Sequence, residues 1–227
     1  MKISVVIPVF NEEKTVSEVI RSVQDVDIDK EIIIVDDGST DKTREILQNL
    51  KEANVKVLFH DKNLGKGGAL KTGFSHATGD IVIPQDADFE LDPSEYHRLI
   101  EPIVQGHADV VYGSRFTGGR PRRVYGFWHM IVNNFLTSLT NILYNTTLTD
   151  METCYKVFKK EVLNNIDIKS RDFSFEPEIT AKIFKKGYRV YEIPVSYYWR
   201  GYAEGKKIRW WHGISAVWTL LKYRFVD

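Results

Sequence analysis

Two acidic clusters stand directly behind apolar runs of the 227-residue chain. Asp36-Asp37-Gly38-Ser39 follows one run, and Asp86-Ala87-Asp88 follows another. Either cluster alone is also an ordinary turn or helix cap. Two such clusters at the strand ends of one sheet indicate a binding site. The first can accept hydrogen bonds from a nucleotide base or ribose, and the second can divide its carboxylates between a divalent cation and a sugar nucleotide. Such oxygen ligands suit Mg²⁺ or Mn²⁺ bridging a diphosphate.

A glycine-rich segment, Asn63-Leu64-Gly65-Lys66-Gly67-Gly68-Ala69, precedes a predicted helix. It is neither the dinucleotide fingerprint G-x-G-x-x-G nor a Walker A loop. Its backbone N–H groups or Lys66 could bind an anion, although a plain glycine-bearing start of a helix fits equally well. The segment therefore gives little support to a nicotinamide dehydrogenase or an ATPase.

The first half of the chain alternates apolar runs with stretches of helical periodicity. The runs predict buried strands at Ile3–Val9, Glu31–Val35, Val55–Phe59, Ile81–Ile83 and Asp109–Tyr112. The intervening helices are expected to have as N-caps Asn11, Ser39 or Thr40, and Asp92. This alternation predicts right-handed βαβ units and a mostly parallel sheet. Parallel sheets bind ligands at the carboxyl ends of their strands, where both acidic clusters stand.

The second half is less regular. Its pattern predicts a long helix, a strand, a helix, a strand or hairpin, and a final amphipathic helix, over Val124–Tyr144, Tyr155–Phe158, Pro177–Lys185, Arg189–Trp199 and Trp211–Phe225.

Composition sets further bounds. A hydrophobic content of 43% excludes a wholly disordered chain, and the single Cys154 excludes an internal disulfide framework, so we expect a cytoplasmic setting. No uninterrupted apolar stretch is long enough for a spanning helix. The net charge of zero argues against a nucleic-acid partner, yet it hides an asymmetry. Residues 1–113 carry 12 basic and 21 acidic residues, and residues 114–227 carry 19 and 10, so the halves have net charges of −9 and +9.

Five blocks run in order over the first 116 residues: Val6-Ile7-Pro8-Val9-Phe10-Asn11-Glu12, Val35-Asp36-Asp37-Gly38-Ser39-Thr40-Asp41, Asn63-Leu64-Gly65-Lys66-Gly67, Asp86-Ala87-Asp88 and Gly113-Ser114-Arg115-Phe116. Together they resemble the inverting family 2 glycosyltransferases, close to the dolichyl-phosphate mannose and glucose synthase group. Two later blocks, Thr149–Lys156 and Phe173–Glu176, resemble a bacterial or archaeal branch of that group.

The resemblance implies an α/β fold of the GT-A class, a Rossmann-like, mostly parallel sheet flanked by helices with an amphipathic helical C-terminal part. It implies one glycosyltransferase domain over residues 1–227, with a nucleotide-sugar-binding half (1–116) and an acceptor or interface half (117–227). Carried over by position, the nucleotide-sugar site would comprise Pro8, Phe10, Glu12, Val35, Asp37, Lys66, Asp86 and Ala87.

The resemblance also assigns the charged chemistry. Asp88 would hold Mg²⁺ or Mn²⁺, joined by Glu90, which stands where the family often has Gln. Asp88 and Arg115 would be the catalytic residues, with Arg115 facing phosphate or the sugar. Arg200 and Lys206 match the six-residue spacing of a late loop whose cations reach the diphosphate, although a solvated charge run is the ordinary interpretation.

The predicted long helix and the last helix each have a broad apolar face with tryptophan, and Arg120-Pro121-Arg122-Arg123 precedes the first of them. Such faces suit a membrane interface, and a core or dimer helix is the alternative. The expected localisation is therefore cytoplasmic, peripheral on the cytoplasmic face of a membrane. A membrane-protein partner or a homo-oligomer is compatible with this.

These features predict transfer of a hexose from a UDP- or GDP-sugar to a polyprenyl phosphate such as dolichyl or undecaprenyl phosphate. A phosphate monoester has a second pKa of roughly 6, so this acceptor arrives ionised and needs no general base. The alternative acceptor, a hydroxyl of a soluble or cell-surface glycan, needs one, and the candidates are Asp150, Glu152, Glu176 and Glu178. A non-catalytic sugar-nucleotide-binding protein is the alternative of another class.

Overall fold

The computed structural model describes residues 1–124, 126–199 and 210–226. In this part of the chain a seven-stranded sheet runs in the order β3-β2-β1-β4-β6-β5-β7. The strands are β1 (Ile3–Val9), β2 (Lys30–Asp36), β3 (Val55–Phe59), β4 (Ile81–Pro84), β5 (Val110–Ser114), β6 (Lys156–Lys159) and β7 (Val190–Pro194). Every pairing is parallel except those of β6, which runs antiparallel to β4 and β5.

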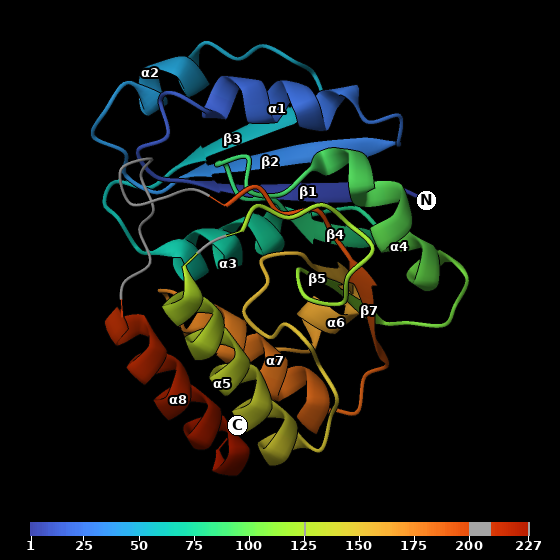
Figure 1. Cartoon of the computed structure of the whole chain (residues 1–227). Coiled ribbons are helices and arrows are strands. Elements are labelled where there is room, and N and C mark those ends of the chain that lie inside the picture. The colour runs from blue at the N-terminus through green and yellow to red at the C-terminus, as the bar shows by residue number, and fades with distance from the viewer. Residues whose placement is uncertain (125, 200–209, 227) are drawn as a thin grey trace.

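Helices cover both faces of the sheet (Figure 1). One face buries its apolar side chains against α1 (Val16–Asp25), α2 (Thr43–Gln48) and α4 (Tyr96–Val104), which follows the short 3₁₀ helix η1 (Pro93–Glu95). The other face buries its side chains against α3 (Lys66–His76), α5 (Phe127–Tyr144), α6 (Lys160–Asn164), α7 (Phe175–Lys185) and α8 (Trp210–Phe225). The predicted strands and the predicted α/β class with a mostly parallel sheet are thus confirmed.

The side chain of Asn11 does not cap α1, contrary to prediction. The helix begins only at Val16, and Asn11 has a left-handed backbone (φ 52°). Its side-chain oxygen accepts a hydrogen bond from the backbone N–H of Thr40 at 2.8 Å, and its own N–H donates to the hydroxyl of Ser39 at 3.0 Å. Since α2 begins at Thr43, Ser39 and Thr40 do not cap it either. These polar residues instead join the loops that follow β1 and β2.

The predicted cap at Asp92 is correct: its carboxylate accepts a hydrogen bond from the backbone N–H of Ser94, with Pro93 in the first position of η1. In the second half, α5 begins at Phe127 rather than Val124, which is 91% exposed. The segment 189–199 forms one strand and no hairpin, because β7 pairs in parallel with β5 at the sheet edge.

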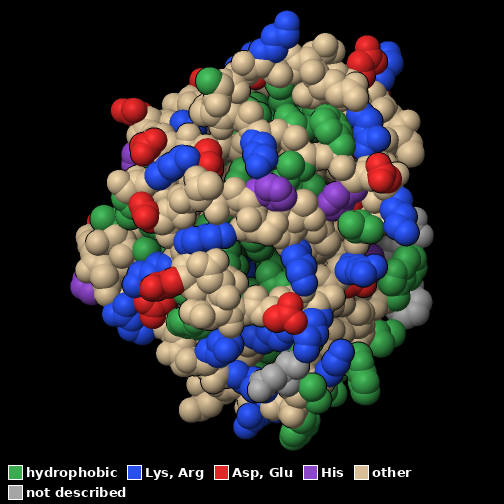
Figure 2. Space-filling model, turned by 180° about the vertical axis from the view of Figure 1, so that it is seen from behind, with side chains coloured by type: hydrophobic (Ala, Val, Ile, Leu, Met, Phe, Trp, Pro, Cys, Tyr) green, Lys and Arg blue, Asp and Glu red, His purple; other side chains and the backbone are tan. Residues whose placement is uncertain are grey.

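No helix within the described ranges is long and apolar enough to cross a membrane. Figure 2 shows one face of the molecule, on which Lys and Arg side chains gather toward the lower half. In Figure 1 that lower half is the layer of α5, α7 and α8.

Candidate functional site

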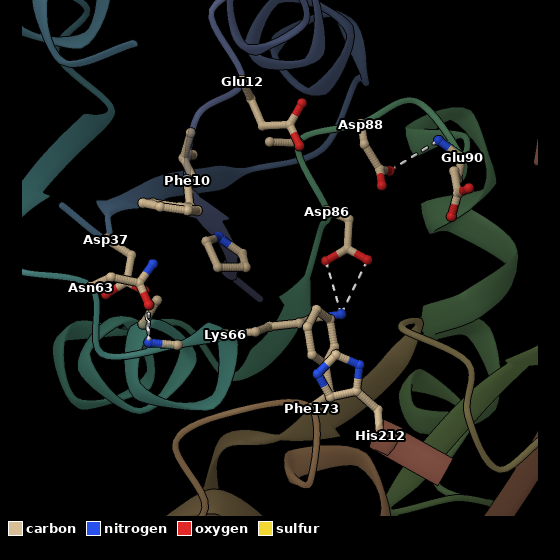
Figure 3. Close-up of a pocket in the computed structure, with 15 residues that line it drawn as sticks. Phe10, Glu12, Asp37, Asn63, Lys66, Asp86, Asp88, Glu90, Phe173 and His212 are labelled. Carbon is tan, nitrogen blue, oxygen red and sulfur yellow. Dashed lines mark hydrogen bonds and ion pairs between the residues drawn. The ribbon is translucent and has the colours of Figure 1, made fainter. Parts of the chain in front are cut away.

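A cavity of about 360 Å³ opens at the carboxyl ends of β1, β2 and β4. Figure 3 shows Phe10 and Asp37 on one side of it and Asp88 and Glu90 on the other, with Phe173 and His212 below. Most of the predicted nucleotide and metal residues line this cavity: Pro8, Phe10, Glu12, Asp37, Lys66, Asp86, Ala87, Asp88 and Glu90. The prediction that residues of the two acidic clusters lie close together at the strand ends is therefore confirmed.

Val35 is not part of the lining. It is fully buried on β2 and packs in the core beneath α3. Arg200 and Lys206 lie outside the described residues.

Asp37 organises the wall of the cavity from a nearly buried position. Its carboxylate accepts hydrogen bonds from the backbone N–H groups of Leu64 and Gly65, both at 2.8 Å. His60 Nδ1 lies 2.7 Å from the same carboxylate. Gly38 allows this close approach, because a Cβ there would lie 2.7 Å from the backbone nitrogen of Asn63. Asp37 thus fixes the loop that leads into α3.

Its neighbour Asp36 has a different partner. Asp36 is fully buried and forms an ion pair with Arg44 at 2.8 Å. Of the first acidic cluster, the cavity therefore presents Asp37 alone.

Lys66 joins the two halves of the chain at the cavity floor. Its ammonium lies 3.1 Å from Asp86 and 3.0 Å from Glu176 Oε1 on α7, with Cys154 Sγ at 3.4 Å. Burial opposes the charge, but the negative groups around Lys66, Asp86 first, raise its pKa well above the ordinary value. The side chain therefore stays protonated at neutral pH. It neutralises Asp86 in a wall that would otherwise hold uncompensated carboxylates.

The turn after β4 carries two carboxylates into the cavity. The backbone N–H of Glu90 donates to Asp88 Oδ1 at 3.1 Å, and Phe89 between them has a left-handed backbone (φ 59°). Tyr197 donates its hydroxyl to Glu90 Oε2 at 3.0 Å. Asp88 and Glu90 therefore lie together in one tight turn that faces the cavity.

The donor set of this turn fits a hard divalent cation. No group of three or more His, Cys, Asp or Glu residues able to hold a metal ion occurs in the described ranges. Asp88 and Glu90 would thus supply part of a coordination shell. A substrate diphosphate and water would have to supply the rest, as is usual for Mg²⁺.

Arg115 is not among the residues that line this cavity, and its expected contact with phosphate or sugar stays a prediction. Its guanidinium forms a two-point ion pair with fully buried Asp150, at 2.6 Å from Nε and 2.7 Å from Nη2. It also donates to Asn133 at 3.1 Å and lies 5.0 Å over the ring of Tyr197. Asp150 therefore fixes the position of the Arg115 guanidinium through Nε and Nη2.

Three of the four candidate bases are likewise held by cations. Asp150 pairs with Arg115, Glu176 binds Lys66, and Glu178 pairs with Lys182. Burial raises the pKa of Glu178, but hydrogen bonds from Lys182 and from the backbone of Ser170 and Lys169 outweigh it and lower the pKa.

Glu152 differs from the other three carboxylates. Its Oε1 is sealed from water and has no hydrogen-bond partner among the described residues, and the same holds for Glu176 Oε2. Burial, followed by the charge of Glu176, raises the pKa of Glu152 to about 7, although Lys156 and Arg115 oppose the rise. A carboxyl with this pKa can accept or donate a proton at neutral pH.

Residues that were not singled out as site residues from the sequence also shape the site, among them Phe173, His212, His60 and Tyr197. Phe173 and His212 line the cavity with ring centroids 4.7 Å apart, and His60 and Tyr197 hold Asp37 and Glu90. Phe173 lies in a block that resembles the family, which was its one available signal. The other three are ordinary residues until the fold brings them to the cavity.

An α/β sheet with an acidic cavity at its strand ends, its second acidic cluster two residues beyond β4, has the form of a GT-A glycosyltransferase. The chain belongs to glycosyl transferase family 2, because the model of that family matches residues 4–167. The predicted family and fold are therefore confirmed.

Two curated relatives are similar in sequence. An uncharacterized protein of Methanocaldococcus jannaschii is 32% identical over 199 residues, covering 86% of this chain and 80% of that protein. The dolichol-phosphate mannosyltransferase of Pyrococcus furiosus is 29% identical over 211 residues, covering 91% of this chain but 59% of that protein.

Among solved structures, glucosyl-3-phosphoglycerate synthase from Mycobacterium tuberculosis in complex with Mn²⁺, UDP and phosphoglyceric acid has a TM-score of 0.76 at 22% identity. The match covers all of this chain and 79% of that one. The same enzyme with Mg²⁺ and UDP has a TM-score of 0.75 and also covers the whole chain. At this identity the likeness supports the fold.

Proposed function

We propose that this glycosyltransferase moves a hexose from a UDP- or GDP-linked donor to a polyprenyl phosphate, with inversion at the anomeric carbon. The relative from Pyrococcus furiosus supports a dolichyl-phosphate acceptor by its name, although this chain spans 59% of its length. The metal-bound and UDP-bound neighbours support a nucleotide donor accompanied by Mn²⁺ or Mg²⁺. Residues 1–116 would bind the donor, and residues 117–227 would meet the acceptor.

The observation that carries a lipid acceptor is the connection between the cavity and an exposed apolar surface. His212 lines the cavity from the first turn of α8, and α8 packs beside α5. Tyr144 on α5 donates to the carbonyl of Leu220 on α8 at 2.7 Å. The outer sides of the two helices form what we call the apolar plate, whose large exposed side chains are Phe127, Trp128, Ile131, Val132, Phe135, Ile142, Trp211, Ile214, Trp218, Leu221 and Phe225.

Basic residues stand in the segments next to these helices, although Arg120 pairs with Glu95 of η1 at 3.3 Å. Exposed Arg120, Arg122 and Arg123 precede α5, and exposed Lys222 and Arg224 lie in the last turn of α8. Aromatic side chains between cations suit the interface of an anionic membrane. A polyprenyl chain could thus remain in the lipid while its phosphate reaches the cavity beside His212.

The residues of the cavity have separable tasks in this proposal. Phe10 and the loop fixed by Asp37 would hold the base and ribose. The start of α3 brings Lys66 and the positive end of a helix dipole to the same cavity, which favours a bound diphosphate. Asp88 and Glu90 would hold the cation, which when bound supplies Lewis-acid stabilisation of the leaving diphosphate.

The acceptor phosphate needs no proton removed before it attacks the anomeric carbon. The remaining work is alignment and charge compensation, in which Arg200 and Lys206 would take part as the family's late-loop cations do. The nucleoside diphosphate, UDP or GDP, leaves from the anomeric carbon as the new phosphate–sugar bond forms on the opposite side. This single displacement inverts the anomeric centre.

Glu152 supports a second candidate, transfer to a glycan hydroxyl. Its pKa of about 7 suits a general base, whereas Asp150, Glu176 and Glu178 are held by cations; like Arg115, however, Glu152 is not among the residues that line the cavity. A hydroxyl acceptor would make turnover depend on the ionised form of Glu152. A phosphate acceptor would not.

The deciding experiment incubates the protein with Mn²⁺, UDP- and GDP-sugars carrying a labelled hexose, and either undecaprenyl phosphate in detergent or soluble oligosaccharides. We expect label in the organic phase, no transfer to the oligosaccharides, and E152Q turnover within a few-fold of the wild type. Transfer to oligosaccharides alone, abolished in E152Q, would establish the hydroxyl acceptor. Binding of a nucleotide sugar without any transfer would leave a binding protein.

A further inference from the structure

The segment that follows β7 contacts both the acidic turn and the basic half of the molecule. Tyr197 lies in this segment and is 3% exposed. Its backbone is fixed on both sides: its N–H donates to the carbonyl of Pro121 at 3.1 Å, and its carbonyl accepts from the N–H of Arg123 at 2.8 Å. Two backbone hydrogen bonds therefore anchor Tyr197 to the residues that lead into α5.

The same segment holds Glu90 at two points. The hydroxyl of Tyr197 donates to Glu90 Oε2 at 3.0 Å. The next residue, Tyr198, donates its backbone N–H to the carbonyl of Glu90 at 3.0 Å. One contact fixes the backbone of the acidic turn, and the other fixes the carboxylate itself. A glutamate side chain has several rotatable bonds, so this second contact selects one direction for the carboxylate.

The ring of Tyr197 has a further neighbour. Arg115 lies 5.0 Å over the ring, and buried Asp150 holds Arg115 in that position. The tyrosine is therefore enclosed between a cation on its face and an anion at its hydroxyl. Both contacts favour the observed ring orientation, which keeps the hydroxyl directed at Glu90.

We infer that Tyr197 is a positioning residue for the divalent-cation site: its hydroxyl holds the Glu90 carboxylate in the direction in which it meets the cation. This rests on the proposed function, in which Asp88 and Glu90 bind Mn²⁺ or Mg²⁺ together with the nucleotide. The hydroxyl of Tyr197 is a hydrogen-bond partner behind a ligand, and such partners typically change metal affinity about 10- to 100-fold when removed.

Equilibrium binding of Mn²⁺, followed by its electron paramagnetic resonance signal in the presence of saturating UDP or GDP, tests the inference without turnover. Y197F removes one hydroxyl and keeps the ring against Arg115. Y198F is the matched control, because Tyr198 is adjacent and its side chain is 51% exposed. We expect the Kd for Mn²⁺ to be about tenfold higher in Y197F than in the wild type, and to stay within twofold of the wild type in Y198F.

A double variant separates positioning from general weakening of the fold. If Tyr197 acts through Glu90, the variant E90Q/Y197F should bind Mn²⁺ with the same affinity as E90Q. The thermal midpoint of Y197F is measured alongside, and the affinity of Y197F for the nucleotide without metal should be unchanged. Wild-type Mn²⁺ affinity in Y197F, or independent and additive losses in the double variant, would overturn the inference while the proposed function stands. Absence of Mn²⁺ binding to the wild type with either nucleotide would overturn the inference and the metal site together.

Discussion

Replacing Glu152 by Gln should stabilise the protein at alkaline pH and leave it nearly unchanged at acid pH. The cause is the sealed Oε1 atom and the neighbouring charge of Glu176, which raise the pKa of Glu152 from 4.5 to about 7. The unfolded chain loses this proton near pH 4.5, but the folded chain keeps it until about pH 7. Between these values the folded state binds more protons, so its stability falls as the pH rises.

The pKa difference sets the size of the effect. Each unit by which folding displaces a pKa changes the free energy of unfolding by about 1.4 kcal/mol. A rise from 4.5 to about 7 therefore lowers the stability above pH 7 by at most roughly 3 kcal/mol. Glu152 is only half-buried by its exposed area, so solvent reduces the penalty, and we expect about 1 to 2 kcal/mol. Gln keeps the shape of the side chain and never ionises.

Urea unfolding at pH 5, 6, 7 and 8 measures this difference. E152Q should match the wild type near pH 5 and exceed it by about 1 to 2 kcal/mol at pH 8. The control is E161Q, because the side chain of Glu161 is 70% exposed. Parallel stability curves for E152Q and the wild type between pH 5 and pH 8 would refute the reasoning, since they would mean that Glu152 ionises normally in the folded protein.

Three further outcomes are expected. D88N should lower turnover at saturating Mn²⁺ by about 100-fold or more, and an unchanged initial rate would remove Asp88 from the cation site. D150N breaks a buried ion pair and should cost about 3 to 5 kcal/mol in urea unfolding, whereas D167N, at a side chain 69% exposed, should cost less than about 0.5 kcal/mol. Replacing Trp128 and Trp218 by Ser should reduce co-sedimentation with vesicles containing anionic phospholipid while turnover on a short, water-soluble prenyl phosphate is kept. Equal sedimentation would argue against the apolar plate as a membrane surface.

Local patterns predicted the donor half of the fold well. Continuous apolar runs such as Ile3–Val9 are typical of strands buried on both faces, and their alternation with helices favours a parallel sheet. Because the carboxyl ends of parallel strands meet at one edge, Asp37 and Asp86 had to converge there. The cavity lining bears this out.

Patterns were weaker wherever a polar residue had more than one possible partner. Asn11 has a side chain suited to a helix cap, yet it binds the backbone of Thr40, 29 residues away. Arg115 stands in a block that resembles the family, and its partner is Asp150, 35 residues away. In both cases the competing partner comes from a distant part of the chain, so spacing along the sequence carries no information about it.

The buried ion pairs do not follow the net charges of the two halves of the chain. Lys66 of the acidic half is held by Glu176 of the basic half, and Arg115 of the basic half is held by Asp150 within that same half. Buried charges require nearby partners of opposite sign, so the core pairs them individually whatever the net charge of each segment.

The sequence by itself determined the sheet, its acidic edge and the family, because these depend on residue types at short and regular spacing. Only the tertiary structure decided which of the charged residues face the cavity and which are neutralised behind it. It alone brought His212 to the cavity and the hydroxyl of Tyr197 to Glu90, across 107 positions of the chain. The physical reason is that a hydrogen bond or an ion pair depends on a separation of about 3 Å in space, and chain folding sets that separation independently of sequence distance.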